Sequence, residues 1–399
     1  MKTELKDNVL TIFLEGRIDS NNAPELEKKL LDIAAQSDSA SKIQIDVDKL
    51  EYISSAGLRV LLKLRKEIKK PLPVINASNE LYEIFSVTGF VELLEVHKKM
   101  REVSVEGCEV LGSGAFSTVY RLDPETIVKI YRPEFNLEFV EGERSASQKA
   151  FLMGIPTAIS YDVVKCGNSY GVIYEMLDAK TEAQIFEEDP SQIPELTRKS
   201  AELLKELHQI VPGPDAGLPK FKQHLFNWLD LLSGYLTAQE IEKIKNFIKN
   251  IPERDTFLHG DYHAKNLILR NGEIQLIDMG SASIGHPIFD ISACMTIYLI
   301  MPATSDKAMN YQTRHRILGF GLEHAQQVWD IMCGTYFGLS SHEEIEAMTK
   351  KLMPYCFLFA VYKITYVHGT EGENFSIFLE KLFRENLLPA IDTAEHLDF

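Results

Sequence analysis

Two periodicities of hydrophobic residues organise the first hundred residues of the chain. Short apolar runs rich in β-branched residues predict strands, whereas apolar residues spaced three and four apart predict helices. The strands are predicted at residues 9–14, 43–47, 72–76 and, at an edge, 91–96. The helices are predicted after Asp19, from Ser54 and at 80–87. Strands that alternate with helices in this way indicate a compact α/β domain over residues 1–100.

A short charged segment at residues 97–102 separates this domain from the rest of the chain. The pattern that follows is first rich in strands and then helical. Strand-like runs lie at 110–120, 127–131, 159–165 and 170–176, with one helix at 135–153. Helices are predicted at 193–209, 218–236 and 238–251, and again across 312–399. Two short strands, joined by Asn271 and Gly272, interrupt the helical part at 267–269 and 274–277.

Composition narrows the class of protein. A chain of 399 residues, 45% hydrophobic and 25% charged, is typical of globular proteins with two or three domains. The net charge of -16 argues against nucleic acid or an anionic membrane as a partner, because both favour surfaces rich in Lys and Arg.

The cysteines and the apolar stretches bear on location. Five cysteines lie far apart without a C-x-x-C pair, which argues against a zinc site or a disulfide framework. The first residues lack the apolar core of a signal peptide, and the longest apolar stretch, near 291–302, is too short and polar to span a bilayer. We therefore expect a cytoplasmic protein without a membrane segment.

The candidate chemistry lies in residues 258–280, where an acid, an amide and a second acid follow one another. Asp261 and Asn266 share one loop, and Asp278 ends an apolar run. Phosphoryl transfer needs a carboxylate near the acceptor hydroxyl and oxygen ligands that hold Mg²⁺. A metal site or a structural cluster built on His259 and His263 is the alternative, but the turn and strands around these histidines argue against a helix that would align them.

Upstream residues could bind a nucleotide. Gly112, Ser113 and Gly114 form a tight turn whose backbone N–H groups could approach phosphate oxygens, although a plain hairpin would also explain them. Lys129 lies in the following strand, from which it could reach the same phosphates. Glu143 is favoured over Glu141 as its ion-pair partner. At the exit of the last strand, the backbone of Glu175 and Met176 could pair with an adenine edge, or could simply end a strand.

The first domain resembles a STAS domain, the fold of anti-sigma-factor antagonists. The resemblance rests on L-E-G-R-I-D-S at 14–20 and Y-I-S-S-A-G-L-R-V-L-L at 52–62. In that family a serine at the start of this helix is phosphorylated, which implies Ser55 as a phosphosite. Many relatives carry Asp where this chain has Ser54, and both serines could equally be ordinary helix caps.

Residues 106–399 resemble the aminoglycoside phosphotransferase and choline-kinase-like branch of the protein-kinase-like fold. The resemblance rests on the order of the glycine turn, the lysine strand, the glutamate helix, H-G-D-x-x-x-x-N and I-D-x-G. Gly260 and His263 favour this branch over protein kinases. It implies an α+β domain with an N-lobe at about 106–178 and a C-lobe at about 179–399.

The resemblance implies a role for each of these residues. Asp261 would orient or deprotonate the acceptor hydroxyl, Asn266 and Asp278 would hold Mg²⁺, and Lys129, oriented by Glu143, would hold the phosphates of ATP. His259 and Asp290 would support the catalytic loop. The C-terminal helices would form the acceptor pocket. Acidic residues such as Glu371, Glu373 and those of the tail 395–398 could receive a cationic acceptor, or could equally be a plain solvated surface.

The expected function is an ATP- and Mg²⁺-dependent phosphotransferase that acts on a hydroxyl of a small molecule. The STAS-like domain would regulate it or dock it to a protein partner. One alternative is a signalling kinase that phosphorylates protein, including its own Ser55. The other is a non-catalytic nucleotide-binding scaffold.

Overall fold

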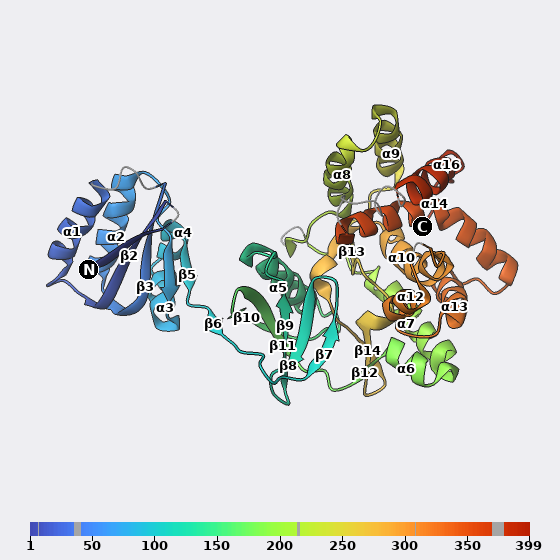
Figure 1. Ribbon diagram of the computed structural model, residues 1–399, viewed down its shortest axis with the longest axis horizontal. Coiled ribbons are helices and arrows are strands. Elements are labelled where there is room, and N and C mark those ends of the chain that lie inside the picture. Colours follow the sequence, from blue (N-terminus) through green and yellow to red (C-terminus); the bar gives the residue numbers. More distant parts are fainter. Residues whose placement is uncertain (7, 36–40, 214–215, 308, 369–378) are drawn as a thin grey trace. The chain divides into compact units, whose positions relative to one another are not determined.

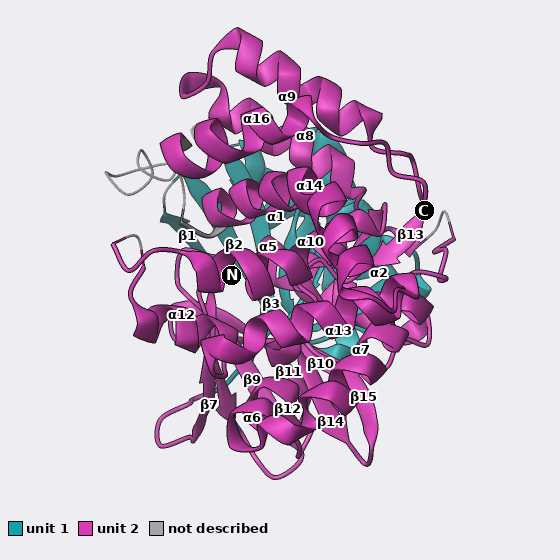
Figure 2. Ribbon diagram, turned by 90° about the vertical axis from the view of Figure 1, so that its right-hand side faces the viewer, with its two compact units in different colours: residues 1–103 teal, residues 104–399 magenta. Residues whose placement is uncertain are grey.

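The computed structural model describes residues 1–399 except 7, 36–40, 214–215, 308 and 369–378. Contacts divide the chain into two compact units, Met1–Val103 and Ser104–Phe399. Figure 1 labels their helices and strands, and Figure 2 shows the two units in different colours. Within the described ranges, no helix is both long enough and apolar enough to cross a bilayer.

The first unit is a five-stranded sheet with helices packed on it, in the order β1-β2-β3-β4-β5. The strands are β1 (Lys2–Lys6), β2 (Val9–Ile18), β3 (Lys42–Ile53), β4 (Val74–Ala77) and β5 (Val96–Lys98). The helices are α1 (Ala23–Ala35), α2 (Ser55–Ile68), α3 (Asn79–Val87) and α4 (Phe90–Leu94). Only β1 runs antiparallel to its neighbour. Alternate side chains such as Ile12 and Ile45 are fully buried, which confirms the α/β fold that the periodicity predicted.

The predicted edge strand at 91–96 is wrong. The chain forms the short helix α4 there, and β5 begins only at Val96. Gly89 and Glu95 both adopt left-handed backbone conformations, which bracket a single helical turn and interrupt an extended path. Leu94 is thereby buried on the helical face.

The second unit begins with an antiparallel sheet in which β10-β11-β9-β8-β7 are neighbours. The strands are β7 (Val110–Ser113), β8 (Ser117–Arg121), β9 (Thr126–Tyr131), β10 (Ser160–Cys166) and β11 (Ser169–Glu175), preceded by the short strand β6 (Arg101–Glu102). The helix α5 (Leu137–Leu152) follows β9, and Asn136 caps its N-terminus by accepting a hydrogen bond from the Phe139 N–H.

The remainder of this unit is mostly helical around a large apolar core. Its helices are α6 (Glu182–Glu188), α7 (Ile193–Leu207), α8 (Phe221–Leu231), α9 (Ala238–Asn250), α10 (Ile288–Met295), α11 (Met301–Ala303), α12 (Tyr311–Leu318), α13 (Ala325–Phe337), α14 (His342–His368) and α16 (Leu388–Asp392). Its short strands are β12 (Lys180–Thr181), β13 (Thr256–Leu258), β14 (Leu267–Arg270), β15 (Glu273–Leu276) and β16 (Ser283–Gly285). The helix predicted at 218–236 is shorter, because α8 ends at Leu231 and a 3₁₀ turn follows.

The hairpin β14–β15 forms where the sequence predicts it. The candidate catalytic and metal-binding residues lie just before β14 and just after β15. Asn271 and Gly272 at its turn both have positive φ, as a tight two-residue hairpin requires. Its register pairs Leu267 with Leu276, so the loop before β14 and the segment after β15 emerge side by side. A sheet-rich lobe followed by a helical lobe confirms the predicted fold class.

Candidate active site

The loop between β13 and β14, residues 259–266, is held in place by a buried carboxylate. Asp290 of α10 accepts the backbone N–H of His259 at 2.8 Å and that of Gly260 at 2.6 Å, one on each carboxylate oxygen. His208 Nε2 lies 3.3 Å from the same carboxylate. Asp290 is fully buried, so these contacts satisfy polar oxygens that would otherwise be costly to bury. Its partners are backbone and imidazole groups, which fits a supporting role.

Gly260 has φ +78°, and a Cβ at this position would overlap the backbone of Ser281. Only glycine fits here without displacing the segment after Asp278. The close approach of Ser281 therefore gives a structural reason for glycine at this position of the loop.

His259 links the loop to the strand that ends before Asp278. Its Nε2 donates to the Ile277 carbonyl at 3.1 Å, and its Nδ1 accepts the Asp261 N–H at 3.2 Å. Burial lowers the pKa of His259 although Asp290 and Asp261 oppose this, so the ring is the neutral tautomer that these two bonds require.

Asp261 is contacted by three side chains. Its Oδ1 pairs with Lys363 Nζ at 2.9 Å, and its Oδ2 lies 3.2 Å from Asn266 Nδ2 and 3.6 Å from His263 Nε2. Burial by itself raises the pKa of Asp261, but Lys363 and His263 lower it more, so the pKa lies well below its usual value. An anion held in this way suits orientation of a hydroxyl better than full removal of its proton.

Lys129 of β9 is the centre of a second cluster. Its Nζ lies 3.2 Å from Glu143 Oε2 and 2.8 Å from Asp278 Oδ1. Burial lowers the pKa of Lys129, but the two carboxylates raise this pKa by more than burial lowers it. The pKa of Lys129 is therefore well above its usual value. Of the two candidate glutamates on α5, the structure pairs Glu143 with Lys129, whereas Glu141 is exposed.

Two further residues fix the position of Glu143. The buried hydroxyl of Tyr131 donates to its carboxylate. Gly280, two residues after Asp278, lies against the same carboxylate so closely that a Cβ would overlap it. The glycine of I-D-x-G therefore leaves space for the acid that orients Lys129.

Asn266 and Asp278 lie close together because the Ile277 N–H donates to the Asn266 carbonyl at 3.0 Å. The Asn266 amide nitrogen is directed at the Asp261 backbone carbonyl, 2.9 Å away, which leaves its side-chain oxygen as a ligand. Across the described residues, no group of three or more His, Cys, Asp or Glu side chains could hold a metal by itself. Two protein oxygens nevertheless fit Mg²⁺, because this ion usually takes one or two protein carboxylates together with substrate phosphates and water.

The glycine turn joins β7 and β8. The Gly114 N–H donates to the Ser117 carbonyl at 2.9 Å, and Gly112, Ser113 and Gly114 are exposed. Gly112 and Ser113 are the last residues of β7, so the turn is shorter than predicted and begins at Gly114. A Cβ on Gly112 would meet nothing within 4 Å, so there is open space beside this end of the strand.

The exit of β11 is more constrained than the sequence suggested. The Glu175 N–H donates to the Ile159 carbonyl at 2.9 Å, and the Met176 N–H donates to the Glu125 carbonyl at 2.8 Å. An adenine edge at these two residues would therefore have to use their carbonyl oxygens. The Glu175 carboxylate forms an ion pair with Arg270 of β14 at 2.8 Å.

The sequence reasoning missed Lys363 and Tyr131. Lys363 is the single charged residue in the largely apolar run 352–367, and this signal could have drawn attention to it. Tyr131 follows Lys129 by two residues and so lies on the same face of β9. Glu371 and Glu373, the candidate acids for the acceptor pocket, lie outside the described residues.

In the first unit, the two serines of the STAS-like motif differ in their environment. Ser54 is the N-cap of α2, and its hydroxyl accepts the Gly57 N–H at 3.4 Å. Ser55 is the first residue of the helix and is exposed.

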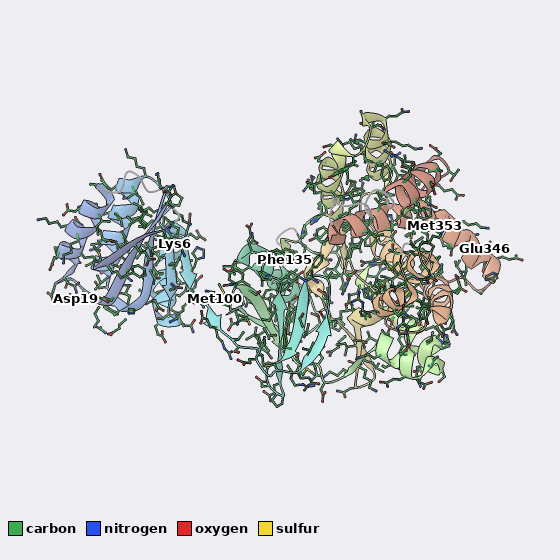
Figure 3. All side chains as sticks on the ribbon, in the orientation of Figure 1. Lys6, Asp19, Met100, Phe135, Glu346 and Met353 are labelled. Atoms are coloured by element: carbon green, nitrogen blue, oxygen red, sulfur yellow. The ribbon has the colours of Figure 1, made fainter. Side chains whose placement is uncertain are left out.

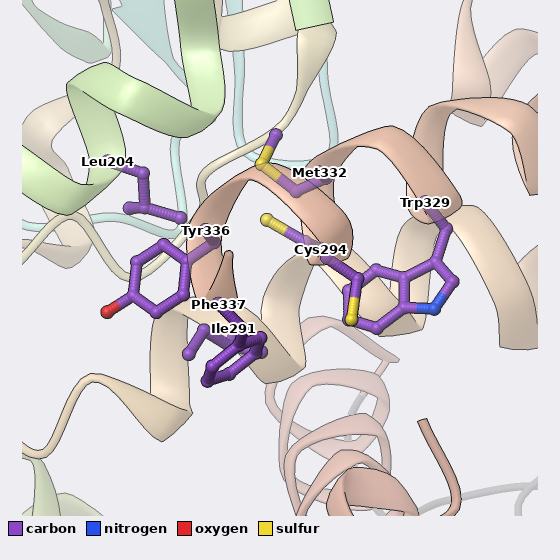
Figure 4. Close-up of a pocket in the computed structure, with 8 residues that line it drawn as sticks. Leu204, Ile291, Cys294, Trp329, Met332, Tyr336 and Phe337 are labelled. Atoms are coloured by element: carbon purple, nitrogen blue, oxygen red, sulfur yellow. The ribbon is translucent and has the colours of Figure 1, made fainter. Parts of the chain in front are cut away.

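One cavity lies apart from these residues, between α7, α10 and α13 (Figure 4). It has a volume of about 10 Å³ and an apolar lining that includes Leu204, Ile291 and Trp329. It has room for about one water molecule and offers no polar surface, so it is a packing gap.

A sequence profile of the phosphotransferase enzyme family, abbreviated APH, matches residues 107–323, more than half of the chain. The chain belongs to this family. A profile of the STAS domain matches residues 1–103, so this APH-family phosphotransferase carries an N-terminal STAS domain. Both family resemblances expected from the sequence are confirmed.

Curated relatives match the STAS domain. The chain is 35% identical over 94 residues to BtrV of Bordetella bronchiseptica, provisionally named an anti-sigma factor antagonist. That match spans 23% of this chain and 78% of BtrV. The chain is 29% identical over 96 residues to the anti-sigma-B factor antagonist of Bacillus subtilis, spanning 23% of this chain and 85% of that protein.

Solved structures of phosphotransferases match most of the chain. An ADP-bound aminoglycoside phosphotransferase, APH(2'')-Ib, is 17% identical, with a TM-score of 0.44, over 79% of this chain and 97% of that one. A choline/ethanolamine kinase family protein from Mesorhizobium loti is 14% identical, with a TM-score of 0.43, over 72% and 92%. The family assignment rests on the sequence profile alone.

Proposed function

We propose that this APH-family phosphotransferase transfers the γ-phosphoryl group of ATP, with Mg²⁺, to a hydroxyl of a small molecule. The observation that supports this most is the position of Lys129, whose ammonium bonds both Glu143 and Asp278. Asp278 in turn lies beside Asn266, whose amide bonds Asp261. A phosphate-binding cation, two metal-binding oxygens and an acceptor-binding carboxylate thus form one connected site.

Each residue of this site has one task in the proposal. Lys129 holds phosphate oxygens, Glu143 fixes Lys129, and Asn266 and Asp278 supply oxygen ligands to Mg²⁺. When bound, Mg²⁺ would neutralise part of the negative charge of the phosphates. ATP is the donor substrate. A bond forms between the γ-phosphorus of ATP and the acceptor oxygen while the bond between this phosphorus and ADP breaks. The proton of the acceptor hydroxyl leaves to Asp261 or to water.

ATP as the donor is supported by relatives, because one similar structure is described as ADP-bound and another as a complex with streptomycin and ATP. The STAS domain would regulate the enzyme or dock it to a protein partner, as the anti-sigma-factor antagonists that it resembles suggest. We disfavour a non-catalytic scaffold, because the chain has a candidate for each acid, amide and cation that the reaction needs.

The variant Asp261→Asn tests the site. It keeps the size of the side chain and removes the charge that orients the hydroxyl, so kcat should fall by about 10²–10⁴-fold while ATP binding persists. Turnover is measured as ADP release with a panel of hydroxylated metabolites, aminoglycosides and choline-like amines. Asp255→Asn is the control, because Asp255 is an exposed residue that pairs with Lys220 at the surface. Normal turnover in Asp261→Asn would contradict the proposed site.

A further inference from the structure

The last turns of α14 contact both sides of the site. Lys363 Nζ lies 2.9 Å from Asp261 Oδ1, in the loop before β14. One turn further on, the ring of Tyr366 lies 6.0 Å from that of Phe116, at the glycine turn. Phe116 also packs edge-on against Phe135, 5.3 Å between centroids. Phe135 is labelled in Figure 3. The side of Asp261 that would meet an acceptor is therefore bounded by α14.

Lys363 brings a positive charge to this position. Its side chain is 23% exposed. Burial lowers the pKa of Lys363, but Asp261 raises it more, so the ammonium stays charged. The charge therefore lies where a hydroxylated acceptor would approach Asp261.

The other charged groups of the site have partners of their own. Lys265 belongs to the same loop as Asp261, and its Nζ donates to the backbone carbonyl of Arg316 at 3.1 Å. Asp278 is paired with Lys129. Among these lysines, Lys363 is the one that pairs with the Asp261 carboxylate.

The Asp261 carboxylate is therefore already paired with the Lys363 ammonium before an acceptor binds. A cationic acceptor would have to displace Lys363 from Asp261 or approach its ammonium closely, and repulsion between like charges a few ångströms apart is substantial in a partly buried site. A carboxylate or phosphate on the acceptor could instead pair with Lys363, which would bring a neighbouring hydroxyl to Asp261.

We propose that Lys363 is a specificity-determining residue that selects a small hydroxylated acceptor bearing an anionic group, a carboxylate or a phosphate monoester. This inference rests on the proposed function, because it concerns the acceptor of the same transfer. Lys363 bridges Asp261 and the anionic group of the acceptor, and the acceptor hydroxyl lies beside Asp261.

Three small molecules with a hydroxylated three-carbon skeleton test the charge preference. Glycerate is anionic, glycerol is neutral and aminopropanediol is cationic. Their binding to the full chain is measured by calorimetry, without ATP turnover. The wild-type chain should bind glycerate at least about tenfold more tightly than aminopropanediol, since one favourable charge pair at an effective dielectric of about 20 is worth that much or more. Lys363→Met should bring the two within about threefold, and Lys363→Glu should reverse their order.

Lys351→Met is the matched control. Lys351 lies on the same helix, is similarly buried at 18% exposure, and pairs with Asp398. This variant should keep the wild-type order, and Trp228 and Trp329 fluorescence should show that each variant is folded, because both tryptophans lie in this unit.

The inference is overturned if the wild-type chain binds aminopropanediol as well as or better than glycerate, if it binds none of the three, or if Lys363→Glu leaves the order unchanged. Turnover assays on the same samples separate this from the proposed function. Binding in the predicted order without ATP turnover for any acceptor would contradict the phosphotransferase proposal and leave the charge preference standing. Turnover with a preference for cationic acceptors would do the reverse.

Discussion

Glu143 and the residues around it show how single positions constrain this site. Its carboxylate accepts from Tyr131, pairs with Lys129 and lies against Gly280. Each of these contacts limits a different movement of the acid. A methyl group on residue 280 would overlap the Glu143 carboxylate. Because this carboxylate orients Lys129, the orientation of Lys129 depends on Gly280, a residue without a functional group.

Gly280→Ala tests this dependence. The added Cβ would displace the Glu143 carboxylate, so Lys129 would lose one of its two partners, and kcat/KM should fall by about tenfold or more. Gly142→Ala is the control, because Gly142 precedes Glu143 in α5 and a Cβ there meets nothing within 4 Å. That variant should keep its activity and gain about 0.5–1 kcal/mol of unfolding free energy. Equal turnover in the two variants would refute the packing argument.

At the scale of elements, a buried acid joins two helices beneath the catalytic loop. Glu182, in the first turn of α6, is 2% exposed and accepts the hydroxyl of Ser200 on α7. The Ser200 carbonyl accepts the hydroxyl of Tyr262, a catalytic-loop residue, at 2.7 Å. Burial raises the pKa of Glu182 to about 8 despite the Ser200 bond, so the carboxyl is protonated at neutral pH.

This predicts a pH dependence of stability. The folded state keeps a proton on Glu182 that the unfolded state, with its ordinary pKa of 4.5, releases. The unfolding free energy should therefore fall as pH rises from 4.5 to about 8, by an amount on the order of a few kcal/mol. Glu182→Gln should remove most of this loss.

Urea unfolding followed by tryptophan fluorescence at about pH 6 and about pH 9 measures the effect. Glu188→Gln, on the same helix but exposed and paired with Lys180, should keep the wild-type dependence. An identical loss of stability in wild type and Glu182→Gln would show that other groups control it.

At the scale of the whole molecule, an APH-family phosphotransferase and a STAS domain are joined in one chain, each with its own apolar core. The two serines that begin α2 have separable tasks. Ser54 uses its hydroxyl to cap the helix, whereas Ser55 is exposed at a helix N-terminus, where free N–H groups favour a phosphate. Ser55 thus remains our proposed phosphosite.

Incubation of the full chain with labelled ATP tests the phosphosite. If the chain phosphorylates its own STAS domain, which is the alternative to a small-molecule acceptor, label should appear on Ser55 and not on Ser54, as mapped by mass spectrometry of peptides. Ser54→Ala should keep the label while it costs about 1 kcal/mol of stability through the lost cap. Loss of label in Asp261→Asn would assign the reaction to the chain's own kinase-like unit. Label on Ser54, or none on either serine, would count against Ser55.

The sequence by itself determined the fold class and the order of the functional segments. Both follow from local signals: alternation in strands, three-and-four spacing in helices, and the positive φ that the Asn271–Gly272 turn requires. Asp261, Asn266 and Asp278 could be proposed together because a tight hairpin brings the segments at its two ends side by side. Local signals failed at 91–96, where left-handed residues at both ends turned an expected strand into α4.

Only the tertiary structure decided which side chains meet across long stretches of chain. Glu141 and Glu143 share one helix, and the rotation of α5 against the sheet places Glu143 at Lys129. The engaged N–H groups of Glu175 and Met176, and the approach of Lys363 to Asp261, likewise depend on packing between distant segments. Such contacts form when buried surfaces fit together, and no periodicity within one segment specifies what the facing segment presents.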